Sequence, residues 1–340
     1  MKYLFRDDYS EGAHPELLEA LTNFNTGQKD GYGLDDVTHF AVERIQKAFA
    51  TDADVHFVIG GTQANLVCLA SMLKPYEAVI AAKTAHISEH EAGAIEATGH
   101  KVIEVETADG RLTPQDIKQV VDGHIDEHMV MPRVVFISQS TERGTIYSKD
   151  ELKAIIDTAH ELGLYVYVDG ARLAIAMTAP GNDLELHDLA LLGVDMFYIG
   201  GTKNGAVLGE AIVIPNKELR GNFRWYLKQH GALLAKGRVV ASQFARFFDE
   251  DKPWLQLGQQ ANDNAQLLIK GLRDAGVEFI AEPATNQIFV NLSNEVIKKL
   301  EKDYGFYVWN PVDASRSTVR LVTSWATDKD MANEFINTIG

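Results

Sequence analysis

The stretch Leu164-Tyr165-Val166-Tyr167-Val168-Asp169-Gly170-Ala171-Arg172 decides the fold. Five consecutive apolar or aromatic residues are typical of a strand that is buried on both faces of a sheet. The preceding segment, Ser148–Leu162, has helical spacing, and Ser148 and Glu151 have the spacing of a capping box. A helix followed by a fully buried strand indicates a mostly parallel sheet covered by helices.

The same rhythm extends in both directions along the chain. A helix is expected over Thr113–Val121, where Thr113 and Pro114 form the cap and first turn. The alternation predicts an α/β fold with a mostly parallel sheet flanked by helices over residues 13–245, after an N-terminal arm over residues 1–12. The other expected strands are Val55–Ile59, Ala78–Ala82, Lys101–Val105, Val134–Ser138, Met196–Ile199 and Ala211–Ile214.

After about residue 245 the pattern changes, which predicts a smaller C-terminal α/β domain over residues 246–340. One long helix is expected within Arg220–Phe248, where it would join the two domains. The small domain is expected to contain helices at Asn262–Ala275, Asn294–Tyr304 and Asp328–Ile339, and strands at Val277–Ile280, Ile288–Leu292 and Val319–Thr323.

Composition and charge narrow the class of protein. The 340 residues include 32 Lys and Arg against 48 Asp and Glu, a net charge of −16, which argues against binding to nucleic acid phosphates. The single cysteine, Cys68, cannot form an intrachain disulfide, so we expect a reducing, cytoplasmic location. Residues 1–21 lack the apolar core of a signal peptide, and turn formers interrupt the uncharged stretch Val55–Leu73, so no export or membrane span is expected.

Three motifs follow predicted strands, at the sheet edge where ligands of open α/β proteins bind. Gly60-Gly61-Thr62-Gln63-Ala64-Asn65 suits a phosphate cradle at a helix start, or is only a glycine turn. Asp169 ends a buried strand, where it would face a cation or donor, or else cap a helix. In Gly200-Gly201-Thr202-Lys203-Asn204-Gly205, the lysine could be a desolvated nucleophile or an exposed loop residue.

Together the three motifs match the parts that hold pyridoxal 5′-phosphate (PLP): a phosphate site, an aspartate for the protonated pyridine nitrogen and a Schiff-base lysine. From Phe5 to about Thr327 the sequence resembles the threonine aldolase and β-eliminating lyase family of fold-type-I PLP enzymes. The tetrad Asp169-Gly170-Ala171-Arg172 and the lysine loop are the most specific parts of this resemblance.

The resemblance implies roles for individual positions. His86 would stack on the pyridine ring, and Arg172 and Arg320 would bind the substrate carboxylate. Tyr32 and Arg238 would act across a dimer interface, Arg238 toward the phosphate. The implied catalytic residues are Lys203, His86, Asp169 and Glu142, the cofactor-binding residues are Gly61, Thr62, His86, Asp169, Arg172, Thr202, Lys203 and Arg238, and the substrate-binding residues are Asp7, Tyr32, Arg172 and Arg320.

The chain departs from the common low-specificity threonine aldolase pattern in three places. Asp7, in Arg6-Asp7-Asp8-Tyr9, stands where the family has a serine that helps bind the carboxylate. Ser140-Thr141-Glu142 replaces the usual Asn-Thr-His, so either Glu142 moves the proton through water or His86 acts alone. The lysine loop looks more like that of phenylserine aldolases, which makes an aryl substrate side chain an option.

The expected function is a PLP-dependent aldolase that cleaves L-threonine, L-allo-threonine or a related β-hydroxy-α-amino acid to glycine and an aldehyde, in a homodimer or homotetramer with the active site at the dimer interface. A PLP-dependent β-eliminating lyase or an aminotransferase is an alternative. A remote alternative is a zinc metallohydrolase, because His86-Ile87-Ser88-Glu89-His90 matches H-x-x-E-H. Its third ligand is undefined, and no metal is expected.

Overall fold

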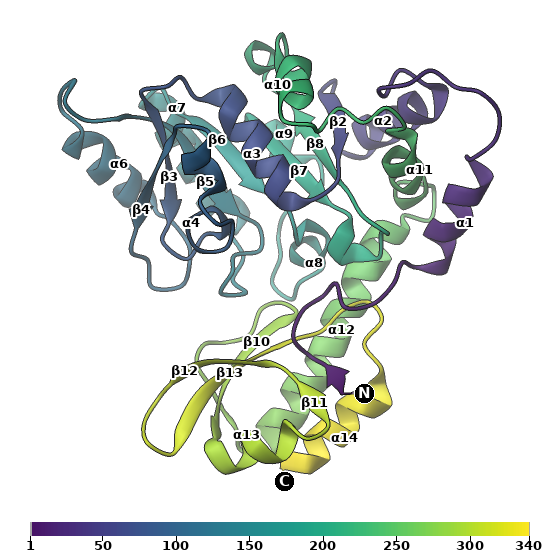
Figure 1. Ribbon diagram of the computed structural model, residues 1–340. Helices are drawn as coiled ribbons and strands as arrows, with labels where there is room; N and C mark the ends of the chain where they lie inside the picture. Colours follow the sequence, from purple (N-terminus) through teal and green to yellow (C-terminus); the bar gives the residue numbers. More distant parts are fainter. Residues whose placement is uncertain (1, 340) are drawn as a thin grey trace.

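The computed structural model describes residues 2–339. Figure 1 shows a large upper part built on one sheet, a smaller lower part built on a second sheet, and the long helix α12 running from one to the other. The division of the chain into an arm (1–12), a large domain (13–245) and a small domain (246–340) stays a prediction.

The large sheet has seven strands in the order β2-β8-β7-β6-β5-β3-β4. Only β8 runs antiparallel to its neighbours, so the predicted mostly parallel sheet is confirmed. Each predicted run forms a strand, with ends shifted by at most a few residues. The strands are β2 (Asp54–Val58), β3 (Glu77–Ala82), β4 (Lys101–Val105), β5 (Met131–Ser138), β6 (Tyr165–Asp169), β7 (Met196–Gly200) and β8 (Glu210–Ile214).

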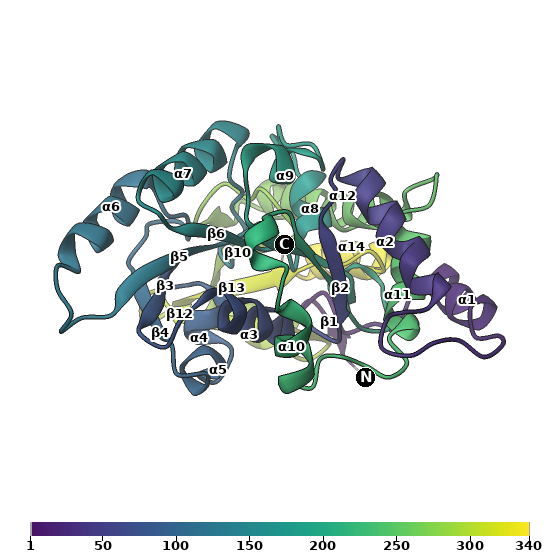
Figure 2. The same cartoon turned by 90° about the horizontal axis from the view of Figure 1, so that it is seen from above.

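Helices cover both faces of this sheet, as the uninterrupted apolar strands require. Figure 2 shows α3 and α10 on one side of the sheet and α6, α7 and α9 on the other. Each side has its own apolar core. The helices of this part are α1 (Pro15–Asn23), α2 (Asp36–Ala48), α3 (Gly61–Met72), α4 (His86–Glu89), α5 (Ala94–Ala97), α6 (Pro114–Gly123), α7 (Lys149–Glu161), α8 (Leu173–Met177), α9 (Asp188–Leu192), α10 (Phe223–Gln229), α11 (Arg238–Phe247), and the 3₁₀ turns η1 (Thr202–Asn204) and η2 (Lys217–Leu219).

Two helix starts have capping boxes, of which the sequence predicts the one at Ser148 and, at Thr113, only the cap. The Ser148 hydroxyl accepts the Glu151 backbone N–H at 3.3 Å, while the Glu151 carboxylate accepts that of Ser148 at 2.9 Å. Thr113 and Asp116 form the same reciprocal pair at the start of α6. These bonds satisfy backbone donors that the first turn leaves free.

The single long helix predicted within Arg220–Phe248 is wrong. The chain instead forms α10 and α11, separated by a loop that begins at His230. Gly231 has φ 69°, a left-handed conformation that ends a helix and that glycine adopts at little cost.

The smaller sheet is antiparallel, in the order β12-β13-β10-β9, and packs on helices around a third apolar core. Strand β12 lies outside the predicted strands; it begins with the apolar run Tyr307-Val308-Trp309, but most of its residues are exposed. The arm strand β1 (Tyr3–Leu4) pairs in parallel with β11 (Tyr304–Gly305), which ends the helix predicted to reach Tyr304. The elements are α12 (Pro253–Asp274), β9 (Glu278–Phe279), β10 (Gln287–Ser293), α13 (Asn294–Leu300), β12 (Tyr307–Pro311), β13 (Arg316–Val322) and α14 (Lys329–Ile339).

Candidate active site

A cavity of about 640 Å³ lies where the carboxyl ends of the large sheet face the smaller sheet. That size is in the range of small-molecule sites. Strands β10, β12 and β13 contribute Gln287, Trp309 and Arg320 to its wall. Among the predicted site residues, the cavity is lined by Gly61, Thr62, His86, Glu142, Asp169, Arg172, Thr202, Lys203 and Arg320.

Asp169 is the last residue of β6, and its carboxylate is almost fully buried. The Tyr198 hydroxyl donates to Oδ1 at 2.5 Å, and the Ala171 N–H donates to the same oxygen at 2.9 Å. The Asn65 amide donates to Oδ2 at 3.0 Å. Within residues 2–339 these donors are neutral, and no ion pair with a Lys, Arg or His compensates the charge. A buried carboxylate in such surroundings favours a cationic ligand group.

Lys203 lies in the 3₁₀ turn η1, directly after β7. Two contacts of Gly201 fix the conformation of this turn. The Gly201 N–H donates to the Glu210 carboxylate at 2.8 Å. The backbone also packs closely, since a Cβ at Gly201 would lie 2.5 Å from the Gly209 carbonyl oxygen. Burial, together with the Arg172 charge, lowers the pKa of Lys203. A lysine with a lowered pKa can react as a neutral amine.

Glycines shape the start of α3 at the cavity wall. A Cβ on Gly61 would lie 2.9 Å from the Tyr198 hydroxyl, so this close approach requires glycine. No side chain caps the helix, which leaves the first-turn N–H groups available to an anion. The Thr202 hydroxyl, which accepts the Gly209 N–H at 3.0 Å, adds a possible donor on the opposite loop.

Asp8, and not the predicted Asp7, bonds an arginine of the cavity wall. Asp8 binds Arg172 through Nε at 2.7 Å and Nη2 at 3.1 Å, and both side chains are buried. Burial opposes ionisation of Asp8, but the charges of Arg172 and Lys203 outweigh it, so its pKa is lowered. Asp7 does not line the cavity; its carboxylate accepts the Ser10 hydroxyl at 2.7 Å within its own turn.

Arg320 is less completely paired than Arg172. Its Nη2 donates to the Gln287 side chain at 2.6 Å, whereas its buried Nε has no partner within residues 2–339. Burial, with the charge of Arg172, lowers its pKa to about 10. A half-buried guanidinium whose buried Nε is a free donor at a cavity wall is suited to a ligand carboxylate.

Glu142 and His86 meet through a backbone contact. The Glu142 Oε1 accepts the His86 N–H at 3.0 Å and the Ser138 hydroxyl at 2.8 Å. Burial and the nearby Asp169 charge raise the pKa of Glu142. Glu142 can therefore hold a proton nearer to neutral pH than an exposed carboxylate does.

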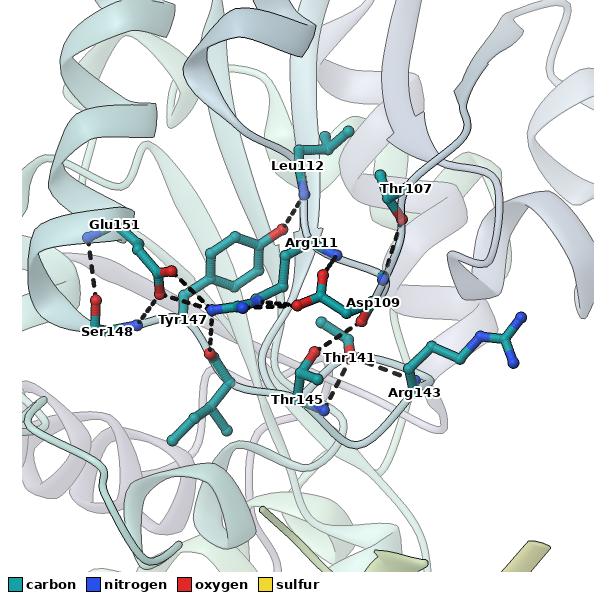
Figure 3. A network of polar contacts seen from close by, with 12 residues as sticks. Thr107, Asp109, Arg111, Leu112, Thr141, Arg143, Thr145, Tyr147, Ser148 and Glu151 are labelled. Carbon is teal, nitrogen blue, oxygen red and sulfur yellow. Dashed lines mark hydrogen bonds and ion pairs between the residues drawn. The ribbon is translucent and has the colours of Figure 1, made fainter. Parts of the chain in front are cut away.

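The network in Figure 3 fixes the loop that bears Glu142. Arg111 bonds Asp109 at 2.6 Å and Glu151 at 2.8 Å, and the Thr145 hydroxyl donates to the Asp109 carbonyl at 2.9 Å. Tyr147, buried beneath them, accepts the Leu112 N–H at 2.7 Å. These contacts attach the C-terminal end of the loop and the start of α7 to the segment that follows β4.

The zinc alternative finds no support in the geometry of this region. Helix α4 spans only His86–Glu89, and the rings of His86 and His90 lie 5.6 Å apart. No group of three or more His, Cys, Asp or Glu side chains within residues 2–339 is arranged to hold a metal ion. The nearest acid to the His86 ring is instead Glu91, 2.7 Å from Nδ1.

Tyr32 and Arg238 lie outside the cavity of their own chain but close to one another. The Tyr32 N–H donates to the Ala235 carbonyl at 3.2 Å, and Gly237, which precedes Arg238, is in contact range of Gly33. Tyr32 is 43% exposed and lines a separate hollow. Their predicted action across a dimer interface stays a prediction.

Sequence reasoning missed several residues of the site. Tyr198 falls within a predicted strand and Glu210 directly precedes one, and neither is assigned a role from the sequence. Both line the cavity, and burial raises the pKa of Glu210 to about 7. Asn65 stood in the glycine motif without a role. Glu91, five residues after His86, is assigned no role from the sequence. A polar residue at a fully buried position was the available signal for each.

Comparison with known proteins agrees with this architecture. The chain is 36% identical to the low specificity L-threonine aldolase of Pseudomonas aeruginosa, over 98% of this chain and 96% of that one. It is 28% identical to that of Escherichia coli K12, over 82% and 81%. The threonine aldolase structure from Leishmania major superposes with a TM-score of 0.96 at 43% identity, covering 99% and 98% of the two chains.

More distant structures share the fold alone. Aspartate aminotransferase from Thermus thermophilus superposes with a TM-score of 0.74 at 15% identity, covering 99% of this chain and 90% of that one.

Within residues 2–339, no helix has the length and apolar character that a membrane span needs. The sequence model of the β-eliminating lyase family matches residues 5–295. The chain therefore belongs to the β-eliminating lyase family, whose members have the fold of PLP enzymes.

Proposed function

We propose that this protein is a PLP-dependent aldolase that cleaves L-threonine, L-allo-threonine or a related β-hydroxy-α-amino acid to glycine and an aldehyde. One observation carries most weight. A half-buried lysine with a lowered pKa and a buried aspartate with only neutral donors line the same cavity. The likeness to low specificity L-threonine aldolases supports the same reaction.

The residues of the cavity fit PLP. Asp169 lacks a cationic partner within residues 2–339, and a protonated pyridine nitrogen would supply one. Gly61, Thr62 and Thr202 would hold the phosphate, and Lys203 would bind the aldehyde carbon. When bound, PLP supplies an electron sink that stabilises negative charge at Cα.

The arginines would fix the substrate. The unpartnered Arg320 Nε suits one oxygen of the amino acid carboxylate. Arg172 is held by Asp8 through its Nε proton and one Nη2 proton, which leaves both Nη1 protons and the second Nη2 proton for a ligand. Both arginines can therefore donate to the carboxylate, and Asp8 fixes the orientation of Arg172.

Cleavage transfers the β-hydroxyl proton to the protein and returns a proton to Cα. His86 lines the cavity and can accept the hydroxyl proton. Glu142, through a water molecule, is the second candidate, because its raised pKa lets it exchange protons near neutral pH. Comparison of His86→Gln with Glu142→Gln would identify the base, since only loss of the base abolishes cleavage while substrate binding persists.

Assembly would complete the site. We place Tyr32 and Arg238 of one subunit at the cavity of a second in a homodimer, or a homotetramer built from such dimers, in the cytoplasm. A mixing experiment tests this arrangement. Lys203→Ala and Arg238→Ala subunits, each weakly active alone, should regain activity when refolded together, because one site of each hybrid dimer has both native residues. Unchanged activity after mixing would argue against a shared site.

The experiment that tests the function identifies products from separate substrates. Supplied with PLP, the enzyme should convert L-threonine or L-allo-threonine to equal amounts of glycine and acetaldehyde, and β-phenylserine to benzaldehyde if the site admits an aryl group. Pyruvate from serine or release of phenol from tyrosine would instead indicate a β-eliminating lyase. Consumption of a keto acid would indicate an aminotransferase.

A further inference from the structure

A chain of buried hydrogen bonds joins His86 to Asp169 behind the cavity wall. The His86 Nδ1 lies 2.7 Å from Glu91 Oε1, and the Asn65 Nδ2 donates to that same oxygen at 2.7 Å. The Asn65 Nδ2 also donates to Asp169 Oδ2 at 3.0 Å. One side-chain amide therefore bridges two carboxylates: that of Asp169, which lines the cavity at the end of β6, and that of Glu91, which lies in the loop after α4.

The orientation of the Asn65 amide is fixed from its other side. The Tyr167 hydroxyl donates to Asn65 Oδ1 at 2.9 Å, so the oxygen faces Tyr167 and the NH₂ group faces the two carboxylates. Asn65 and Tyr167 are both fully buried. With each proton of the NH₂ group directed at one carboxylate, the amide can neither rotate nor bind water without losing a bond.

Glu91 is the unusual member of this chain. Its side chain is 0% exposed, and its Oε2 has no hydrogen-bond partner within residues 2–339. Of the side chains that bond it, Asn65 is neutral and only His86 can become a cation. A buried carboxylate is costly unless a cation compensates it, so this position favours a partner that gains positive charge during the reaction.

The other charged groups near His86 are differently placed. Glu142 accepts the backbone N–H of His86 and does not bond its ring. His90 lies 5.6 Å away, ring to ring, and the half-exposed Glu89 approaches His90 at 3.8 Å. Glu91 is thus the acid that bonds the His86 ring.

We propose that Glu91 is a positioning residue for His86, and that Asn65 holds Glu91 and Asp169 in one rigid unit. The inference rests on the proposed function, in which His86 faces the cofactor and substrate. Glu91 keeps a proton on Nδ1, which leaves Nε2 as an acceptor on the cavity side. When Nε2 takes up a proton, the Glu91 carboxylate stabilises the imidazolium, as the acid of a carboxylate–histidine pair does.

Glu91→Gln removes the charge but keeps the shape, because both existing donors point at the single oxygen Oε1, which a glutamine carbonyl can replace. We expect kcat for L-threonine to fall roughly tenfold or more, the loss typical of a bond to a charged group, with KM unchanged. Glu89→Gln is the matched control, since it removes a nearby exposed carboxylate and should leave kcat at the native value.

A second readout does not depend on turnover. In PLP-loaded enzyme labelled with ¹⁵N-histidine, with His86→Gln used to assign the signal, neutral His86 should show a protonated Nδ1 in the native protein and in Glu91→Gln. In Glu91→Ala the acceptor is absent, and the Nε2–H tautomer should appear. Asn65→Ala should also lower PLP affinity about tenfold in equilibrium dialysis, as loss of a supporting hydrogen bond does.

The outcomes separate the inference from the proposed function. A native enzyme that leaves threonine intact contradicts the function, whatever the tautomer. An Nε2–H tautomer in the native protein, or equal kcat values for Glu91→Gln and Glu89→Gln in an active enzyme, overturns the positioning role. If Glu91→Ala does not fold, the native tautomer and the Glu91→Gln kinetics still decide the question.

Discussion

Replacing Asp8 with asparagine tests how the N-terminal arm supports the site. The Asp8 carboxylate is 0% exposed and binds Arg172, itself 9% exposed, through two bonds of 2.7 and 3.1 Å. The Asn286 amide donates to the same carboxylate at 2.9 Å. Asp8→Asn keeps the size of the side chain but leaves a buried guanidinium without its counter-charge. Breaking a buried pair in this way costs about 3–5 kcal/mol.

The pH dependence of this loss has a definite sign. The folded pKa of Asp8 is lowered from its ordinary 3.8, so the pair contributes its full stability above about pH 5. That contribution disappears as the pH falls through the folded value, because the protonated acid resembles asparagine. The unfolding free energies of native protein and variant should therefore differ at pH 7 and converge in acid.

Urea unfolding followed by circular dichroism, at several pH values and with PLP concentration held fixed, measures the difference. Asp7→Asn is the matched control, because Asp7 bonds only within its own exposed turn, and its loss should cost under about 1 kcal/mol. Equal unfolding free energies for Asp8→Asn and Asp7→Asn at pH 7 would refute the reasoning.

Three further substitutions test separate parts of the account. Asp169→Asn removes the charge opposite the pyridine nitrogen, so kcat should fall at least about 100-fold and PLP affinity should weaken; unchanged values in both assays would remove its electrostatic role. Arg320→Ala should raise KM for threonine about 10- to 100-fold with little change in kcat, whereas an altered kcat alone would exclude carboxylate binding. Desolvation lowers the pKa of the half-buried His56 from 6.5 to about 4, so His56 destabilises the fold as the pH falls from 6.5 toward 4. Between pH 7 and 4, the unfolding free energy of the native protein should therefore fall by about 3 kcal/mol more than that of His56→Leu. Parallel pH profiles of unfolding free energy for the two proteins would contradict this.

The strands could be predicted because burial on both faces leaves a plain signal. Tyr165–Asp169 and Met196–Gly200 are buried at nearly every position, and the motifs that follow them meet at one sheet edge for topological reasons. The helix predicted across Gly231 failed because a single left-handed residue outweighed the apolar spacing around it.

The contacts within the site were less accessible to sequence reasoning. Asp7 and Asp8 are adjacent, and which of them turns inward depends on the pairing of β1 with a strand about 300 residues away. Asn65 bonds Asp169 across 104 positions, and no local pattern encodes that contact. Tyr32 and Arg238 depend on a second subunit, whose approach the sequence of one chain does not describe.

The central claim is that the Lys203 amine forms the covalent link to PLP. Borohydride reduction of the PLP-loaded native protein, followed by digestion and peptide mass spectrometry, tests it most directly. We expect one phosphopyridoxyl group per chain, on the peptide that contains Lys203, and none on that peptide after prior displacement with excess L-threonine. A reduced adduct on another lysine, or an unmodified Lys203 in protein that retains PLP, would contradict it.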